Sequence, residues 1–196
     1  NFSKNKSWFL VVVLGLDIST SCTGYCILEL KNKKITLIKA DAIKLTSGKD
    51  LYQKAAILSE HLNSIVKQYS PSKIVVEENL QSFRPGLSSA KTILSLAKFN
   101  GIACYVSYKI TNITPISINV TKARSLCGLK ISRKSGLDTK TQVLNFIKNH
   151  PTFSGFNWPT KTLKNGPRRG MTIEDPSCFD IADAAIITLS SLIEQS

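Results

Sequence analysis

VVVLGLDISTS, at residues 11–21, passes from an apolar run through one aspartate into a small polar turn. The run that overlaps it, residues 8–18, has the near-continuous apolar character of a central β-strand that is buried on both faces. Asp17 would then lie at the carboxyl end of this strand, where α/β sheets place their functional groups. The stretch therefore predicts a sheet with a polar site at one edge.

The rest of the chain alternates between strand and helix patterns. Short apolar or alternating runs predict further strands at residues 24–30, 34–43, 74–76, 102–110 and 115–120. Apolar residues at helical spacing predict helices at residues 50–68, 87–99, 121–127, 138–149 and 178–193. Residues 151–176 contain the glycines and prolines of a long loop. This order indicates one α/β domain over residues 1–196, with a mixed five-stranded sheet flanked by helices.

The chain is strongly basic, because its 196 residues include 26 Lys and Arg against 13 Asp and Glu, a net charge of +13. A compact protein tolerates such self-repulsion most easily beside a polyanion, and counterion release favours nucleic acid in that position. An anionic membrane is the alternative partner, but no basic amphipathic helix stands out. The longest apolar run, Phe9–Leu16, is too short to span a bilayer. We therefore expect a nucleic-acid partner, no membrane and no small-molecule substrate.

The five cysteines are scattered along the chain and odd in number. This usage predicts free thiols in a reducing, intracellular environment. Cys22 and Cys26 lie far from both histidines and no second cysteine pair exists, so a zinc site is not expected. The compartment stays open between a mitochondrion or plastid and the cytoplasm or nucleoid of a bacterium or of a virus-infected cell.

Four acids stand where they could hold metal ions. Asp17 and Glu77 each follow an apolar strand, and Asp180 and Asp183 share one face of an otherwise apolar helix. Buried carboxylates are costly unless cations pair with them. Four of them can hold two Mg²⁺ ions, which activate water and stabilise the leaving oxygen in phosphodiester hydrolysis. Each acid alone could instead have a structural role, such as capping a turn. Glu78, beside Glu77, is expected on the opposite face of its strand.

Basic residues gather in two segments. Six of them lie between residues 122 and 140, against one acid, and four more lie in the predicted loop. They are Lys122, Arg124, Lys130, Arg133, Lys134 and Lys140, followed by Lys161, Lys164, Arg168 and Arg169. We expect the first segment to bind phosphates on a track that leads to the carboxylates, and we assign the second segment to nucleic-acid binding as well. A solvated charged face is the alternative.

Four motifs resemble those of RuvC-type Holliday-junction resolvases, members of the ribonuclease-H-like superfamily. They are LGLDISTSCTGY at residues 14–25, IVVEE at 74–78, SINVTK at 117–122 with Gly128 and KTQV at 140–143, and DIADA at 180–184. Their order and spacing are compatible with the family, and the similarity extends from about residue 11 to residue 189.

The resemblance implies a ribonuclease-H-like fold and a four-way DNA junction as the substrate. It implies that Asp17, Glu77, Asp180 and Asp183 are the catalytic metal ligands. They would hold two Mg²⁺ ions per active site, with Mn²⁺ as a substitute. A homodimer would then cut two strands of the junction symmetrically.

The sequence also departs from the family pattern. The family places an aromatic residue soon after the glutamate, to stack at the junction centre, whereas Leu80 occupies the near position here. We assign this role to Phe83, and DNA contact to Arg84 beside it. The predicted loop at 151–176 is longer than in the bacterial pattern, so the resemblance does not supply its role.

Three other functions stay open. A related nuclease of the YqgF type would use the same fold and acids on structured RNA. An ATPase of the actin and sugar-kinase type also has a strand that ends in Asp, but it requires a second lobe that this sequence lacks. A junction-binding module without catalysis would not need the full set of acids. Cleavage of a four-way DNA junction, compared with duplex and structured RNA, separates the first alternative from the resolvase.

Overall fold

The structure, a computed structural model, describes residues 10–45, 48–78 and 90–193. Its central sheet has five strands in the order β3-β2-β1-β4-β5. The strands are β1 (Leu10–Asp17), β2 (Cys22–Lys31), β3 (Lys34–Lys44), β4 (Lys73–Glu77) and β5 (Ile116–Ile118). The pairs β1–β2 and β2–β3 are antiparallel, whereas β1–β4 and β4–β5 are parallel. The predicted mixed five-stranded sheet is confirmed.

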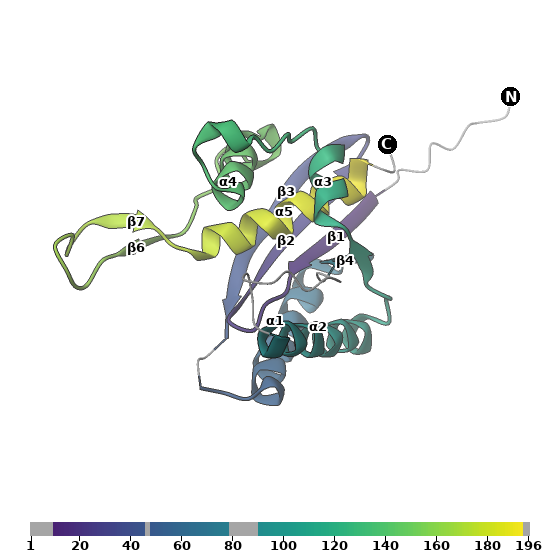
Figure 1. The fold of residues 1–196 in the computed structure, drawn as a ribbon. Coiled ribbons are helices and arrows are strands. Elements are labelled where there is room, and N and C mark those ends of the chain that lie inside the picture. The colour runs from purple at the N-terminus through teal and green to yellow at the C-terminus, as the bar shows by residue number, and fades with distance from the viewer. Residues whose placement is uncertain (1–9, 46–47, 79–89, 194–196) are drawn as a thin grey trace, which may run out of the picture.

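Helices cover both faces of this sheet (Figure 1). α1 (Leu51–Tyr69) and α2 (Ala90–Thr111) pack on one face, and α3 (Val120–Leu126), α4 (Thr139–Asn149) and α5 (Ser177–Ile193) pack on the other. Neighbouring residues of β1 serve different cores: Val13 lies in the core below α5, and Leu14 in the core below α1 and α2. This division follows from the alternation of side chains along a strand.

Local signals fix the ends of several elements. The carboxylate of Asp50 accepts a hydrogen bond from the main chain of Gln53 at 2.8 Å and so caps α1. Asp138 caps α4 in the same way through Thr141, at 2.7 Å. The described helices include none with the length and apolar character that a membrane span requires. All five cysteines are free thiols, as predicted.

The prediction of a strand at residues 102–110 was wrong, because α2 continues without a break to Thr111. Asn100 and Gly101 had suggested a helix end, but Gly101 lies inside the helix. The buried residues of α2 are Phe99, Ala103 and Ser107, which are spaced four residues apart on one helical face. The run around them is apolar enough to resemble a strand, and its helical period becomes decisive only against the core below α1 and α2.

The prediction of a loop at residues 151–176 was wrong in part, because this segment contains regular structure. A 3-10 turn at Pro151–Phe153 is followed by an antiparallel pair, β6 (Thr160–Thr162) and β7 (Thr172–Glu174). We call residues 160–174 the ribbon. Its end is closed by hydrogen bonds between the main chains of Leu163 and Met171, at 2.9 Å, and of Gly170 and Leu163, at 2.8 Å. The ribbon projects away from the sheet and its helices (Figure 1).

Candidate active site

Asp17 and Glu77 end two neighbouring parallel strands. β1 and β4 are paired in register up to Leu16 and Val76, so the next residue of each strand is one of the two acids. Parallel strands bring their carboxyl ends to the same edge of a sheet, and the two carboxylates therefore meet there. Burial is the main cause that raises the pKa of Glu77 to about 7, and the negative charge of Asp183 adds to it.

Helix α5 brings the other two acids, Asp180 and Asp183, to the same edge of the sheet. Its main chain lies close to the sheet at Gly24, the residue that is paired with Asp17 between β1 and β2. A Cβ atom on Gly24 would lie 2.1 Å from the main-chain oxygen of Asp180. Only glycine leaves room for such an approach of helix and strand. The sequence placed Gly24 in a motif, but it did not indicate this contact.

The start of α5 is held by Asp175. Its carboxylate accepts hydrogen bonds from the main chain and hydroxyl of Ser177, at 2.9 and 2.6 Å, and pairs with Lys44 at 3.1 Å. The Ser177 hydrogen bonds, helped by Lys44, lower the pKa of Asp175 to about 2. These contacts tie the base of the ribbon to β3 and orient the helix just before Asp180.

The four predicted acids form one electrostatic cluster. Burial is the main cause that raises the pKa of each of them. Repulsion from other members of the four adds to it at Asp17, Glu77 and Asp183, whereas at Asp180 the repelling acid is Asp175. For Asp17 the repelling groups are Glu77, Asp183 and Asp180, in that order. Lys140 opposes this rise of the pKa at all four acids. A carboxylate cluster that is so costly to ionise is typical of a functional site.

Two side chains that were not predicted as partners contact the acids of α5. The side chain of Asp183 is almost buried, and its Oδ1 lies 3.7 Å from Nη2 of Arg124. Neither this oxygen nor Nε of Arg124 has a hydrogen-bond partner. Cys22 and Asp180 line the same cavity. Burial and the negative charge of Asp180 raise the pKa of Cys22 to about 12.

The fit of the four acids to a metal ion depends on how closely their side chains are gathered. Across residues 10–45, 48–78 and 90–193, no three Asp, Glu, His or Cys side chains are gathered closely enough to hold an ion as they stand. Each acid is engaged instead by a neighbour, namely a second acid, a thiol or Arg124. The donors nevertheless fit a divalent cation, since four carboxylates offer the oxygen ligands that Mg²⁺ prefers. The buried, unpartnered Oδ1 of Asp183 is the clearest of these donors.

The predicted basic residues lie in several places. Lys140 and Arg124 are close enough to act on the acids. Lys130 and Arg133 line a pocket beside α3, while Lys122 and Lys134 are exposed near it. Lys161, on β6, lines a cavity of about 390 Å³ together with Asp180. The remaining three, Lys164, Arg168 and Arg169, are exposed at the end of the ribbon. Phe83 and Arg84 lie outside the described residues.

The side chain of Glu78 contacts a different neighbour from the side chain of Glu77. Its carboxylate accepts a hydrogen bond from Nδ2 of Asn119 at 3.1 Å. Asn119 also caps α3 through the main chains of Thr121 and Lys122, at 3.0 and 3.2 Å. Glu77 stays the predicted site acid, because it ends β4 beside the end of β1 that carries Asp17.

A mixed sheet of this order, with a final helix that brings two acids to the end of β1, defines a ribonuclease-H-like fold. A solved structure supports this class. The RuvC protein of Thermus thermophilus, in complex with a Holliday junction substrate, is similar with a TM-score of 0.64. The structural similarity covers 94% of this chain and 94% of that one at 14% sequence identity. At this identity the similarity supports the fold only.

Residues 13–149 match the family described as crossover junction endodeoxyribonuclease RuvC, and the chain therefore belongs to the RuvC family. The RuvC protein of Dictyoglomus thermophilum is 23% identical over 189 residues, 94% of this chain and 98% of that protein. The one from Christiangramia forsetii is 25% identical over 92 residues, 47% of this chain and 45% of its own length. Several of the relatives thus match over only about half of their length.

Proposed function

We propose that this chain is a structure-selective endonuclease that resolves four-way DNA junctions, and that it acts as a homodimer that cuts two strands symmetrically. The observation that carries the proposal is the placement of the acids: Asp17 and Glu77 end the paired strands β1 and β4, and α5 lies with Asp180 against Gly24, the partner of Asp17 in β2. Membership of the RuvC family supports the same substrate, since the relatives are named crossover junction endodeoxyribonucleases.

The four acids are the proposed ligands of two Mg²⁺ ions, with Mn²⁺ as a substitute. When bound, such ions activate a water molecule and stabilise the leaving oxygen of a phosphodiester. The chain itself holds the carboxylates at the ends of β1 and β4 and on α5, in a place from which most solvent is excluded. Lys140, at the start of α4, acts on all four acids and is placed to meet a DNA phosphate beside them.

A cleavage assay tests the proposal. A four-way junction with labelled strands is expected to be cut at paired positions, while matched duplex DNA and structured RNA are cut much more slowly. Cleavage of the RNA in preference to the junction would favour the RNA-processing alternative. Sedimentation of the protein with and without the junction tests the homodimer.

Removal of the divalent cation is expected to abolish this cleavage. With excess EDTA the rate falls to background, because the carboxylates alone supply no charge that stabilises the leaving oxygen. Addition of Mg²⁺ or Mn²⁺ in excess over EDTA restores it, and binding of the junction is measured in parallel. Cleavage that persists in EDTA would rule out the metal-ion mechanism.

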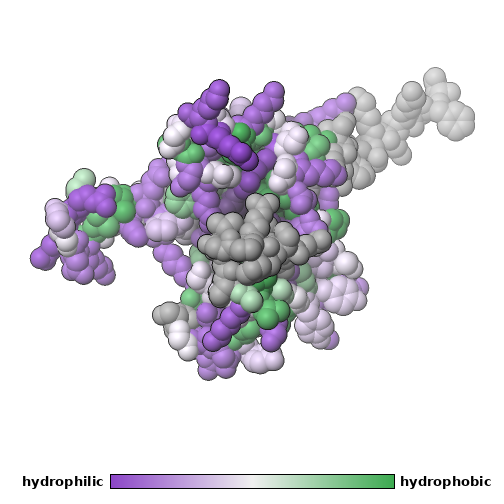
Figure 2. Space-filling view, in the orientation of Figure 1, coloured by the Kyte–Doolittle hydropathy of each residue, from purple (hydrophilic) through white to green (hydrophobic). Residues whose placement is uncertain are grey.

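The ribbon is proposed to bind a duplex arm of the junction through its four basic residues, Lys161, Lys164, Arg168 and Arg169. Its surface is largely hydrophilic (Figure 2). The one acid of the ribbon, Glu174, is paired with Lys148 on α4. A two-stranded ribbon is narrow enough to enter the major groove of DNA. The base of the ribbon is held by Asp175, so an arm bound there would keep a defined direction relative to α5.

Neutralising these four residues to glutamine is expected to weaken junction binding and to reduce its salt dependence. The slope of log K against log salt should fall by roughly 0.9 for each phosphate contact that is lost. The control is a junction with arms too short to reach the ribbon, on which wild type and variant should bind alike. An unchanged slope on long-armed junctions would remove the ribbon from the DNA interface.

A further inference from the structure

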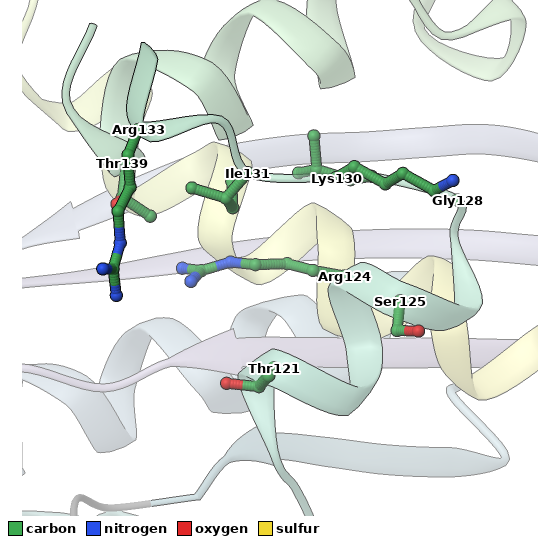
Figure 3. A pocket seen from close by; sticks show the side chains of 9 residues that line it. Thr121, Arg124, Ser125, Gly128, Lys130, Ile131, Arg133 and Thr139 are labelled. Carbon is green, nitrogen blue, oxygen red and sulfur yellow. The ribbon is translucent and has the colours of Figure 1, made fainter. Parts of the chain in front are cut away.

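A second basic site lies next to the acids, in a pocket between α3 and residues 128–139. The pocket has a volume of about 560 Å³, and three cations, Arg124, Lys130 and Arg133, line it without any acid. Hydroxyl groups of Thr121, Ser125 and Thr139 complete its polar lining. The guanidinium groups of Arg124 and Arg133 lie at the same end of the pocket, whereas Lys130 extends toward the other end (Figure 3). We call it the α3 pocket.

The α3 pocket has the chemistry of a phosphodiester site. Like charges are brought together there at a cost that an anion would relieve. Guanidinium groups and hydroxyls are donors that suit the oxygens of a phosphate. The pocket opens beside Asp183, since one of its lining residues, Arg124, is the ion-pair partner of that acid.

The contact between Arg124 and Asp183 is incomplete. At 3.7 Å the distance from Nη2 to Oδ1 is longer than that of an ordinary hydrogen bond. Oδ1 of Asp183 and Nε of Arg124 are both buried and both lack a hydrogen-bond partner. Buried groups left in this state cost free energy, and better partners would relieve it. A divalent cation is such a partner for Asp183, and a phosphate is such a partner for Arg124.

We infer that the α3 pocket binds a backbone phosphate of the DNA, and that Arg124 moves from Asp183 to this phosphate when a divalent cation occupies the acids. The inference rests on the proposed function and extends it. In the metal-free protein, Arg124 is then the counter-ion of Asp183. In the protein that has bound a divalent cation and DNA, Arg124 is a ligand of the phosphate. Binding of the cation and binding of the DNA strand are thereby coupled through one side chain.

Calorimetry of metal-free protein with Mn²⁺ alone tests the first half of the exchange. Arg124→Gln is expected to bind Mn²⁺ more tightly than wild type, by about 3-fold to 5-fold, because the cation no longer displaces an ion-pair partner. Arg133→Gln removes the same charge from the pocket without touching Asp183, and its Mn²⁺ affinity should equal that of wild type. Weaker Mn²⁺ binding by Arg124→Gln would overturn the inference.

Junction binding tests the second half. In Ca²⁺, Arg124→Gln is expected to bind a four-way junction about 10-fold more weakly than wild type, the scale of one lost hydrogen bond to a charged group. In EDTA the loss should be much smaller, because Arg124 is then held by Asp183. Arg133→Gln should lose affinity in both conditions. An equal loss by Arg124→Gln in EDTA and Ca²⁺ would show a simple phosphate contact and would overturn the exchange.

A third variant distinguishes the loss of the phosphate contact from a folding defect. Arg124→Lys keeps a cation near Asp183 but lacks the planar fork that suits a phosphate. It should therefore bind Mn²⁺ as wild type does and still bind the junction more weakly in Ca²⁺. Full junction affinity in this variant would contradict the inference. If wild type itself binds neither Mn²⁺ nor the junction, the proposed function fails, and this result is distinct from a failure of the exchange.

Discussion

Asp17→Asn is expected to reduce junction cleavage by on the order of 10³-fold or more, the scale seen when preorganised electrostatic stabilisation is removed from an active site. Burial and repulsion from the other three acids raise the pKa of Asp17, which ends the strand paired with that of Glu77. The amide cannot serve as a charged ligand, so the site loses a quarter of its proposed carboxylates. Binding of the junction should be retained, because the basic residues proposed to contact phosphate are unchanged.

The matched control for this variant is Glu78→Gln. It makes the same kind of change, acid to amide, one residue beyond Glu77, at a carboxylate that accepts a hydrogen bond from Asn119. Cleavage by Glu78→Gln should stay close to that of wild type. Asp17→Asn should also melt at a higher temperature than wild type in EDTA, because one charge leaves a buried, repelling cluster. Cleavage by Asp17→Asn at the wild-type rate would refute the site assignment.

Gly24→Ala is expected to cause the largest loss of stability. The added Cβ would lie 2.1 Å from the oxygen and 2.3 Å from the carbonyl carbon of Asp180. Both atoms belong to main chain, so α5 must shift away from β2. We expect the free energy of unfolding to fall by about 3 kcal/mol, the upper part of the range for overpacked cores. Cleavage should fall as well, since the shift moves Asp180 and Asp183 relative to Asp17.

Gly101→Ala provides the control for the added methyl group. Gly101 lies within α2, and a Cβ there would meet nothing within 4 Å. Because alanine favours the helix and restricts the unfolded chain, this variant should be more stable by roughly 0.5–1 kcal/mol. Urea denaturation of both variants gives the comparison. Equal stability of Gly24→Ala and wild type would mean that α5 does not depend on this contact.

Features encoded over a few residues could be predicted from the sequence. The strands that end in Asp17 and Glu77 were predicted from apolar runs that stop at an acid, and the structure places both acids at strand ends. The helix starts near Asp50 and Asp138 follow from capping, which involves residues only three apart. Such signals act within one strand or one helical turn, so they do not depend on the rest of the fold.

Features that depend on distant contacts were decided by tertiary structure. The segment at 102–110 is helical because Ala103 and Ser107 pack against a core built from β1, β4 and α1. The pair of Arg124 and Asp183 joins residues on α3 and α5, and their approach depends on how both helices lie on the sheet. Local propensity is short in range, whereas these contacts require the order and register of strands far apart in the chain. The sequence alone therefore determined which residues could form the site, and the packing of α3, α4 and α5 on the sheet determined which of them meet.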